Sequence, residues 1–120
     1  MRRAFAHNAV LRIEDGGDDR APGAAITVAL CGHWDHEPPC PLAPHLTVVE
    51  RTGDEVRLRV LFAAEPDAET EVRGRIAAAL ALPSFLGLDG VLTRWHLLRG
   101  EPSDVTETES EHTERLLHGN

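Results

Sequence analysis

The sequence predicts an α+β fold, in which an antiparallel β-sheet of about five strands has one main helix packed on one face. Two observations lead to this prediction. Two alternating apolar and polar runs, Leu46–Arg51 and Val56–Ala63, flank a short turn, and a single amphipathic helical pattern follows Asp67. The chain has 120 residues, of which 42% are hydrophobic, and this suits a domain with a core of its own.

The first two elements are predicted to be strands joined as a hairpin. Apolar and charged residues alternate in Ala4–Glu14, as they do in a half-buried strand. Gly16–Gly23 is rich in glycine and aspartate, so we expect a loop there. In Ala25–Cys31 every second residue is a large apolar one, which indicates a second strand; these residues are Ile26, Val28 and Leu30.

The clearest hairpin and the clearest helix come next. Thr52–Glu55 contains a Gly-Asp pair between the two alternating runs, which is typical of a tight turn. In the helix, Asp67 is the expected N-terminal cap and Pro83 the expected stop. The predicted apolar stripe of this helix consists of Val72, Ile76, Ala79 and Leu80.

The remaining chain is predicted to form a loop, a last strand and a tail. Ser84–Gly90 is the loop, with Phe85 and Leu86 as buried anchors, and Val91–Arg99 is the strand. Glu101–Asn120 has six acidic residues and one arginine, so we expect a flexible acidic tail or a frayed helix. One α+β domain is therefore predicted over residues 1–100, with a tail over residues 101–120.

Charge and hydropathy exclude some classes of function. The formal net charge is -8 and all 12 basic residues are arginines, so neither nucleic acid nor an anionic membrane is an expected partner. No apolar run reaches the length of a membrane span. The first residues lack the apolar stretch of a secretory signal, and we expect a cytoplasmic protein.

The segment Cys31–His45 carries the chemistry. The chain contains nine cysteines and histidines, so a window of 15 residues should hold about one, but this window holds five. Half of the eight prolines also lie between Gly32 and Pro44, which excludes a helix or a central strand. We therefore predict a Pro-rich loop that binds a metal ion.

Thiolate and imidazole groups together are the ligands that Zn²⁺ prefers, although Cu or Fe also binds some of these groups. The predicted tetrahedral set is Cys31, His33, Cys40 and His45, with His36 as a fifth candidate. The spacing matches no standard zinc finger or zinc protease motif. His7 and His96 lie within predicted strands, and we interpret them as hydrogen-bonded sheet residues.

Three functions fit this pattern. The metal ion holds the loop in shape for interaction with a protein or small-molecule partner, or an open coordination position serves catalysis, or the protein senses or carries metal. In the enzyme alternative, Asp35, Glu37 or His36 would act as acid or base. The uncovered face of the sheet is predicted to be solvated, covered by the loop, or used in a homodimer.

Overall fold

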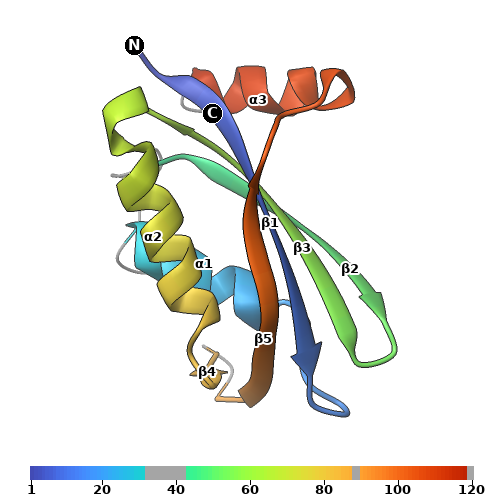
Figure 1. Cartoon of the computed structure of the whole chain (residues 1–120). Coiled ribbons are helices and arrows are strands. Elements are labelled where there is room, and N and C mark those ends of the chain that lie inside the picture. Colours follow the sequence, from blue (N-terminus) through green and yellow to red (C-terminus); the bar gives the residue numbers. More distant parts are fainter. Residues whose placement is uncertain (32–42, 88–89, 119–120) are drawn as a thin grey trace.

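A computed structural model of the chain describes residues 1–31, 43–87 and 90–118 (Figure 1). Its elements are β1 (Arg3–Ile13), α1 (Ala21–Cys31), β2 (His45–Thr52), β3 (Glu55–Ala64), α2 (Glu69–Leu80), β4 (Ser84–Leu86), β5 (Leu92–Ser103) and α3 (Ser110–Leu117). Short 3-10 turns at Pro66–Ala68 and Glu107–Glu109 lead into α2 and α3. The α+β class and the antiparallel sheet are confirmed.

The sheet has the strand order β2-β3-β1-β5-β4, and every neighbouring pair is antiparallel. Strand β1 lies in the centre, paired with β3 on one side and β5 on the other. Helices α1 and α2 each connect strands that are not neighbours, which gives the split β-α-β arrangement with β4 added at one edge. The sheet curls strongly, into a half-barrel (Figure 1).

The main core lies between one face of the sheet and the helix pair α1 and α2, which pack side by side (Figure 1). The predicted apolar stripe of α2 is confirmed, because all four of its residues are buried. From the sheet, Leu11, Ile13 and Phe62 are buried against the helices. The indole Nε1 of Trp95 donates to the Leu80 carbonyl at 3.0 Å, which ties β5 to the end of α2.

The hairpin of β2 and β3 is also confirmed. Thr52 pairs with Glu55, and Gly53 in the turn has a φ of 63°, a conformation that glycine adopts without strain. The predicted cap of α2 is wrong. Asp67 lies inside the 3-10 turn, and Ala68, the residue that precedes α2, makes no side-chain capping bond.

The predicted strand Ala25–Cys31 and its hairpin with the first strand are wrong, because this segment is part of α1. Most residues of α1 are buried, so the helix has no polar face to give a helical period. A short apolar run of this kind does not distinguish a strand from a buried helix. Pro22 in the first turn and the alanines at 21, 24, 25 and 29 favour the helix.

Two further predictions near the last strand need correction. Ser84–Leu86 is not a loop but a short strand, β4, that pairs with β5 at Leu92–Arg94. Phe85 packs against the core, whereas Leu86 is 61% exposed and is not a buried anchor. A three-residue strand is too short to show an alternating pattern, which explains why the sequence did not reveal it.

The segment predicted as an acidic tail contributes to the fold. Residues 101–103 extend β5, and α3 packs across the other face of the sheet at one end. Leu116 of α3 is buried against Ala6, Leu61 and Ala63. The acidic composition is compatible with this packing because α3 is amphipathic, so its charged residues remain at the surface.

An ion pair holds the α3 region to the sheet. The guanidinium of Arg59 on β3 donates to both carboxylate oxygens of Glu109, at 2.6 and 2.8 Å. Arg59 also donates to the Asn8 side chain and to the Asp104 carbonyl. Both members of the pair are largely buried, with 24% and 16% of their side-chain surface exposed. The Arg59 guanidinium lowers the pKa of Glu109 from 4.5 to about 2.

We predict that Glu109→Gln lowers the free energy of unfolding by about 1–3 kcal/mol, because it leaves Arg59 with a weaker, uncharged partner. A carboxyl group with a lowered pKa stabilises the fold fully above pH 4.5, and this contribution is lost as the pH falls towards 2. Urea unfolding measured from pH 7 to pH 2.5 tests both effects. Glu107→Gln, in the same 3-10 turn but at an exposed position, is the control. An equal loss in both variants would contradict the assignment.

Candidate functional site

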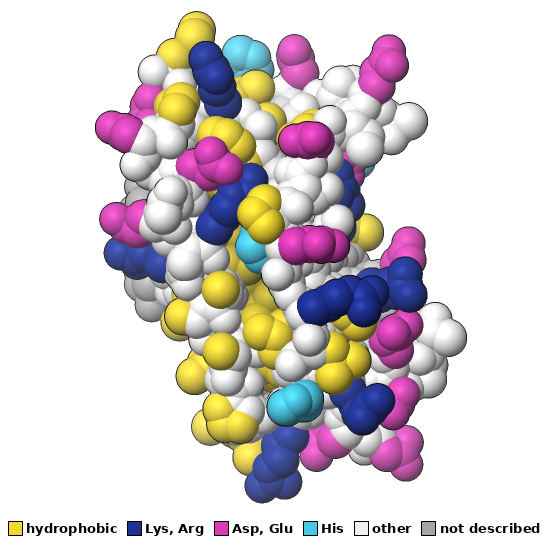
Figure 2. Space-filling model, in the orientation of Figure 1, with side chains coloured by type: hydrophobic (Ala, Val, Ile, Leu, Met, Phe, Trp, Pro, Cys, Tyr) yellow, Lys and Arg dark blue, Asp and Glu magenta, His cyan; other side chains and the backbone are white. Residues whose placement is uncertain are grey.

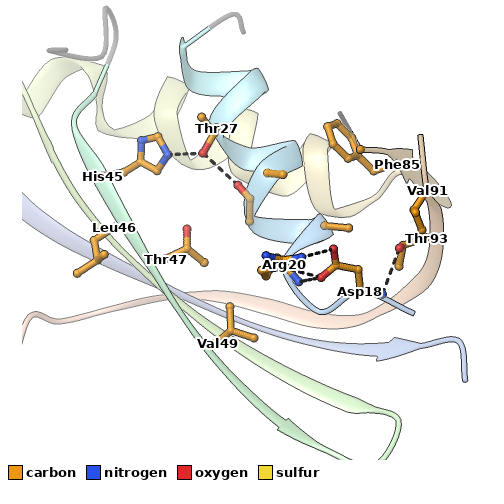
Figure 3. A pocket seen from close by; sticks show the side chains of 14 residues that line it. Asp18, Arg20, Thr27, His45, Leu46, Thr47, Val49, Phe85, Val91 and Thr93 are labelled. Atoms are coloured by element: carbon orange, nitrogen blue, oxygen red, sulfur yellow. Dashed lines mark hydrogen bonds and ion pairs between the residues drawn. The ribbon is translucent and has the colours of Figure 1, made fainter. Parts of the chain in front are cut away.

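A pocket of about 580 Å³ lies between α1, β2 and the β4–β5 end of the sheet (Figure 3). Its size is within the range of small-molecule binding sites. Six apolar residues supply much of its wall: Ala21, Ala24, Leu46, Val49, Phe85 and Val91.

Helix α1 meets strand β2 at Gly23 and Thr47. A Cβ placed on Gly23 would lie 3.5 Å from Thr47 Cγ2, so without a side chain the helix faces Thr47 with backbone alone. The Thr27 hydroxyl lies 3.2 Å from the Gly23 carbonyl, one turn earlier in the helix. The helix therefore lies close to the strand at this point, and both Gly23 and Thr47 line the pocket.

One polar end of the pocket is the start of α1. The Arg20 side chain donates to Asp18 at 3.1 and 3.3 Å, and the Asp18 amide donates to the Thr93 hydroxyl at 3.2 Å. Hydrogen bonds from the side chain and the amide of Arg20 lower the pKa of Asp18. At this end, the carboxylate and the guanidinium neutralise each other.

The other polar end contains His45, the first residue of β2. Its Nε2 lies 3.0 Å from the Thr27 hydroxyl on α1, and its Nδ1 lies 3.1 Å from the Ala43 carbonyl (Figure 3). These contacts orient the imidazole ring and join the start of β2 to α1.

Between the two ends lies a polar atom without a partner. The Thr47 hydroxyl oxygen is buried, and among the buried side-chain oxygens and nitrogens of the described residues it is the one without a hydrogen bond. In Figure 3 it points from β2 towards α1. Such a group is unfavourable by about 1–3 kcal/mol relative to a hydrogen-bonded one. Thr47 is therefore the feature of this pocket that packing alone does not explain.

The structure describes only part of the predicted metal set. Cys31 is the last residue of α1 and His45 the first residue of β2. His33, His36 and Cys40 lie outside the described residues, as do Asp35 and Glu37. Among the residues that are described, no three His, Cys, Asp or Glu side chains come together as a metal site would require. The predicted site thus remains a prediction.

His7 lies elsewhere, on the helix-covered face of β1. It is buried, and its Nδ1 lies 3.2 Å from the Arg73 guanidinium, as expected of a hydrogen-bonded sheet residue. Arg73 also contacts the rings of Phe5 and Phe62. Burial lowers the pKa of His7 below 6.5, Arg73 lowers it further, and Glu101 opposes both. His96 is exposed on β5.

The sequence singled out His45 as a candidate metal ligand but did not predict the pocket around it. Thr47 and Thr27 were unremarkable in the sequence, because each belongs to a wall only after α1 crosses β2. The one available signal was Gly23, a glycine inside what proved to be a helix, a position that usually has a packing reason.

We predict that His7 makes the protein less stable in mild acid. Because its pKa is lowered in the folded state, the unfolded chain takes up more protons below pH 6.5, and stability falls as the pH drops through this range. Urea unfolding at pH 7.5 and pH 5.5 should therefore show a smaller pH effect in His7→Gln than in the wild type. If both proteins lose the same free energy, the titration of His7 is not responsible.

Comparisons with known proteins add no family. No protein-family model matches the chain, and no curated protein matches it significantly. Among the described residues, no helix is long and apolar enough to span a membrane. The function is therefore inferred from the residues themselves and from their positions in this fold.

Proposed function

We propose that this protein binds one zinc ion through Cys31, His33, Cys40 and His45, and that the ion holds the Pro-rich segment in shape for interaction with a partner. The observation behind this proposal is the contact between Thr27 and His45. It joins α1, which ends at Cys31, to β2, which begins at His45. This contact supports the proposal because it joins the two elements that flank the segment with the candidate ligands.

The helical spacing strengthens this argument. Cys31 stands four residues after Thr27 in α1, so the two positions share one face of the helix, about one turn apart. The His45 ring reaches that face at Thr27. Cys31 and His45, one from each end of the segment, thus belong to folded elements. Less conformational entropy is then lost on metal binding than if all four ligands lay in a flexible chain.

The chemistry of His45 also suits a ligand. Histidines that bind metal ions commonly donate their other ring nitrogen to a backbone carbonyl, which fixes the tautomer. The contact between His45 Nδ1 and the Ala43 carbonyl is of this kind. Nε2 is then the nitrogen for the metal, and it would exchange the Thr27 hydroxyl for the ion.

The partner is proposed to be a protein or a small molecule. On the face shown in Figure 2, acidic and basic side chains are interspersed, which does not favour nucleic acid. A homodimer through the sheet is a further proposal. The outer edge of β2 pairs with no strand among the described residues, and an unpaired edge of eight residues is a template for another strand.

One observation favours the enzyme alternative. His45 is both a candidate ligand and part of the pocket wall, so a metal ion at Nε2 would border a space large enough for a substrate. An open coordination position would then activate water, with Asp35, Glu37 or His36 as acid or base. In the third alternative, metal sensing or carriage, binding would be weak and Cu would exchange readily.

The zinc proposal predicts about one zinc per chain after expression in zinc-replete medium. Cys31→Ser and Cys40→Ser should lose tight binding, whereas His36→Ala should retain it, since a group outside the ligand set changes affinity by only about 10–100-fold. Native mass spectrometry and competition with a chromophoric chelator measure both quantities. His112→Ala, at an exposed position of α3, is the matched control. A wild-type protein without metal would overturn the proposal, and a metal-poor His36→Ala would overturn the ligand assignment.

Chelation should leave the folded core intact, because the buried apolar side chains of the sheet and helices pack against one another and do not include the predicted ligands. Circular dichroism with and without chelator should therefore show nearly equal secondary structure. A complete loss of structure would instead make the ion a requirement for folding.

A further inference from the structure

We propose that the pocket between α1 and β2 is a binding site for a neutral, largely apolar small molecule that accepts a hydrogen bond from the Thr47 hydroxyl. The proposal goes beyond zinc binding. It depends on residues of α1, β2, β4 and β5 that lie within the described part of the chain.

The wall determines the apolar character of the ligand. Alanine, valine and phenylalanine side chains line the space, and Phe85 adds a flat aromatic surface. Hydrophobic contact with such a wall is the main source of affinity in small-molecule sites, while a few polar groups set orientation.

The charges along the wall favour a neutral ligand. Of the described lining residues, Asp18 and Arg20 are of opposite sign and are hydrogen-bonded to each other. This pair lies at the solvent-exposed end of the pocket, because 83% of the Arg20 side-chain surface is exposed. A charged ligand group beside the buried Thr47 hydroxyl would therefore lose water without meeting either charge of the pair.

The Thr47 hydroxyl supplies the polar contact. Replacing it by a methyl group would remove an unfavourable buried oxygen, so its presence is not explained by stability. The oxygen has almost no exposed surface, and it reaches a ligand by rotation between staggered positions about the Cα–Cβ bond. A carbonyl or ether oxygen of the ligand would then accept its proton.

The test uses Prodan, a neutral naphthyl ketone whose fluorescence shifts to the blue in apolar surroundings, and naphthalene as a competitor without a hydrogen-bond acceptor. Wild-type protein should bind Prodan saturably with one site per chain. Thr47→Val should weaken Prodan binding about two- to tenfold, the effect of one hydrogen bond, and leave naphthalene binding unchanged. Thr52→Val, at an exposed position of the same strand, should change neither.

Filling the pocket gives a second, independent test. Val49→Trp places a large ring into the space and should weaken both probes more than tenfold. Val48→Trp is the control. Val48 directly precedes Val49 in β2, its side chain lies on the opposite face of the strand, and 45% of its surface is already exposed. Circular dichroism and thermal unfolding show whether each variant has folded. If a tryptophan variant does not fold, the proposal is tested by Thr47→Val instead.

Several outcomes would overturn the proposal. They are no saturable Prodan binding by folded wild-type protein, equal binding by folded Val49→Trp and Val48→Trp, or equal Prodan affinity in wild type and Thr47→Val. Zinc content measured in the same samples shows whether a change in Prodan affinity is independent of metal binding. Thr47→Val should keep its zinc, so loss of Prodan affinity with zinc retained supports the pocket alone, and loss of both would assign Thr47 to the metal site instead.

Discussion

The hydrogen bonding of β1 on both of its edges is the constraint on which the rest of this structure depends. Because β1 pairs with β3 and β5 over most of its length, it cannot shift by one residue without breaking both registers. Its alternation then sends Leu11 and Ile13 to the helix pair and Ala6 to α3. Both hydrophobic clusters are thus organised around one strand.

The curl of the sheet and the path of α1 together create the pocket. The helix starts near β5, where the Asp18 amide bonds to Thr93, and passes β2 at Gly23, Thr27 and His45. Because α1 starts beside β5 and contacts β2 further along, a space remains between the helix and the sheet. Among the described residues the buried Thr47 hydroxyl has no hydrogen-bond partner, and an unsatisfied buried group of this kind needs an explanation other than stability.

The second face of the sheet is stabilised differently from the first. Large apolar side chains fill the helix-covered face, whereas α3 contributes one buried leucine and depends in addition on the pair between Arg59 and Glu109. Stability at this end therefore depends on pH through the carboxyl group of Glu109. The lowered pKa of Glu109, about 2, places that sensitivity in acid rather than near neutrality.

The sequence by itself determined the elements whose patterns are local. Alternation identified β1 and the hairpin of β2 and β3, and a period of 3.6 identified the buried face of α2. The sequence also contains five candidate metal ligands in Cys31–His45, and the metal site predicted from them remains to be tested by metal analysis.

Only the tertiary structure decided the remainder. Helix α1 is buried on nearly all sides, so its residues carry no period that separates helix from strand, and β4 is too short to carry one. The helix α3 holds its place through contacts with β1 and β3, which are distant in the sequence. The pocket likewise exists only because α1 crosses β2, and no local pattern can encode which glycine and which threonine will face each other there.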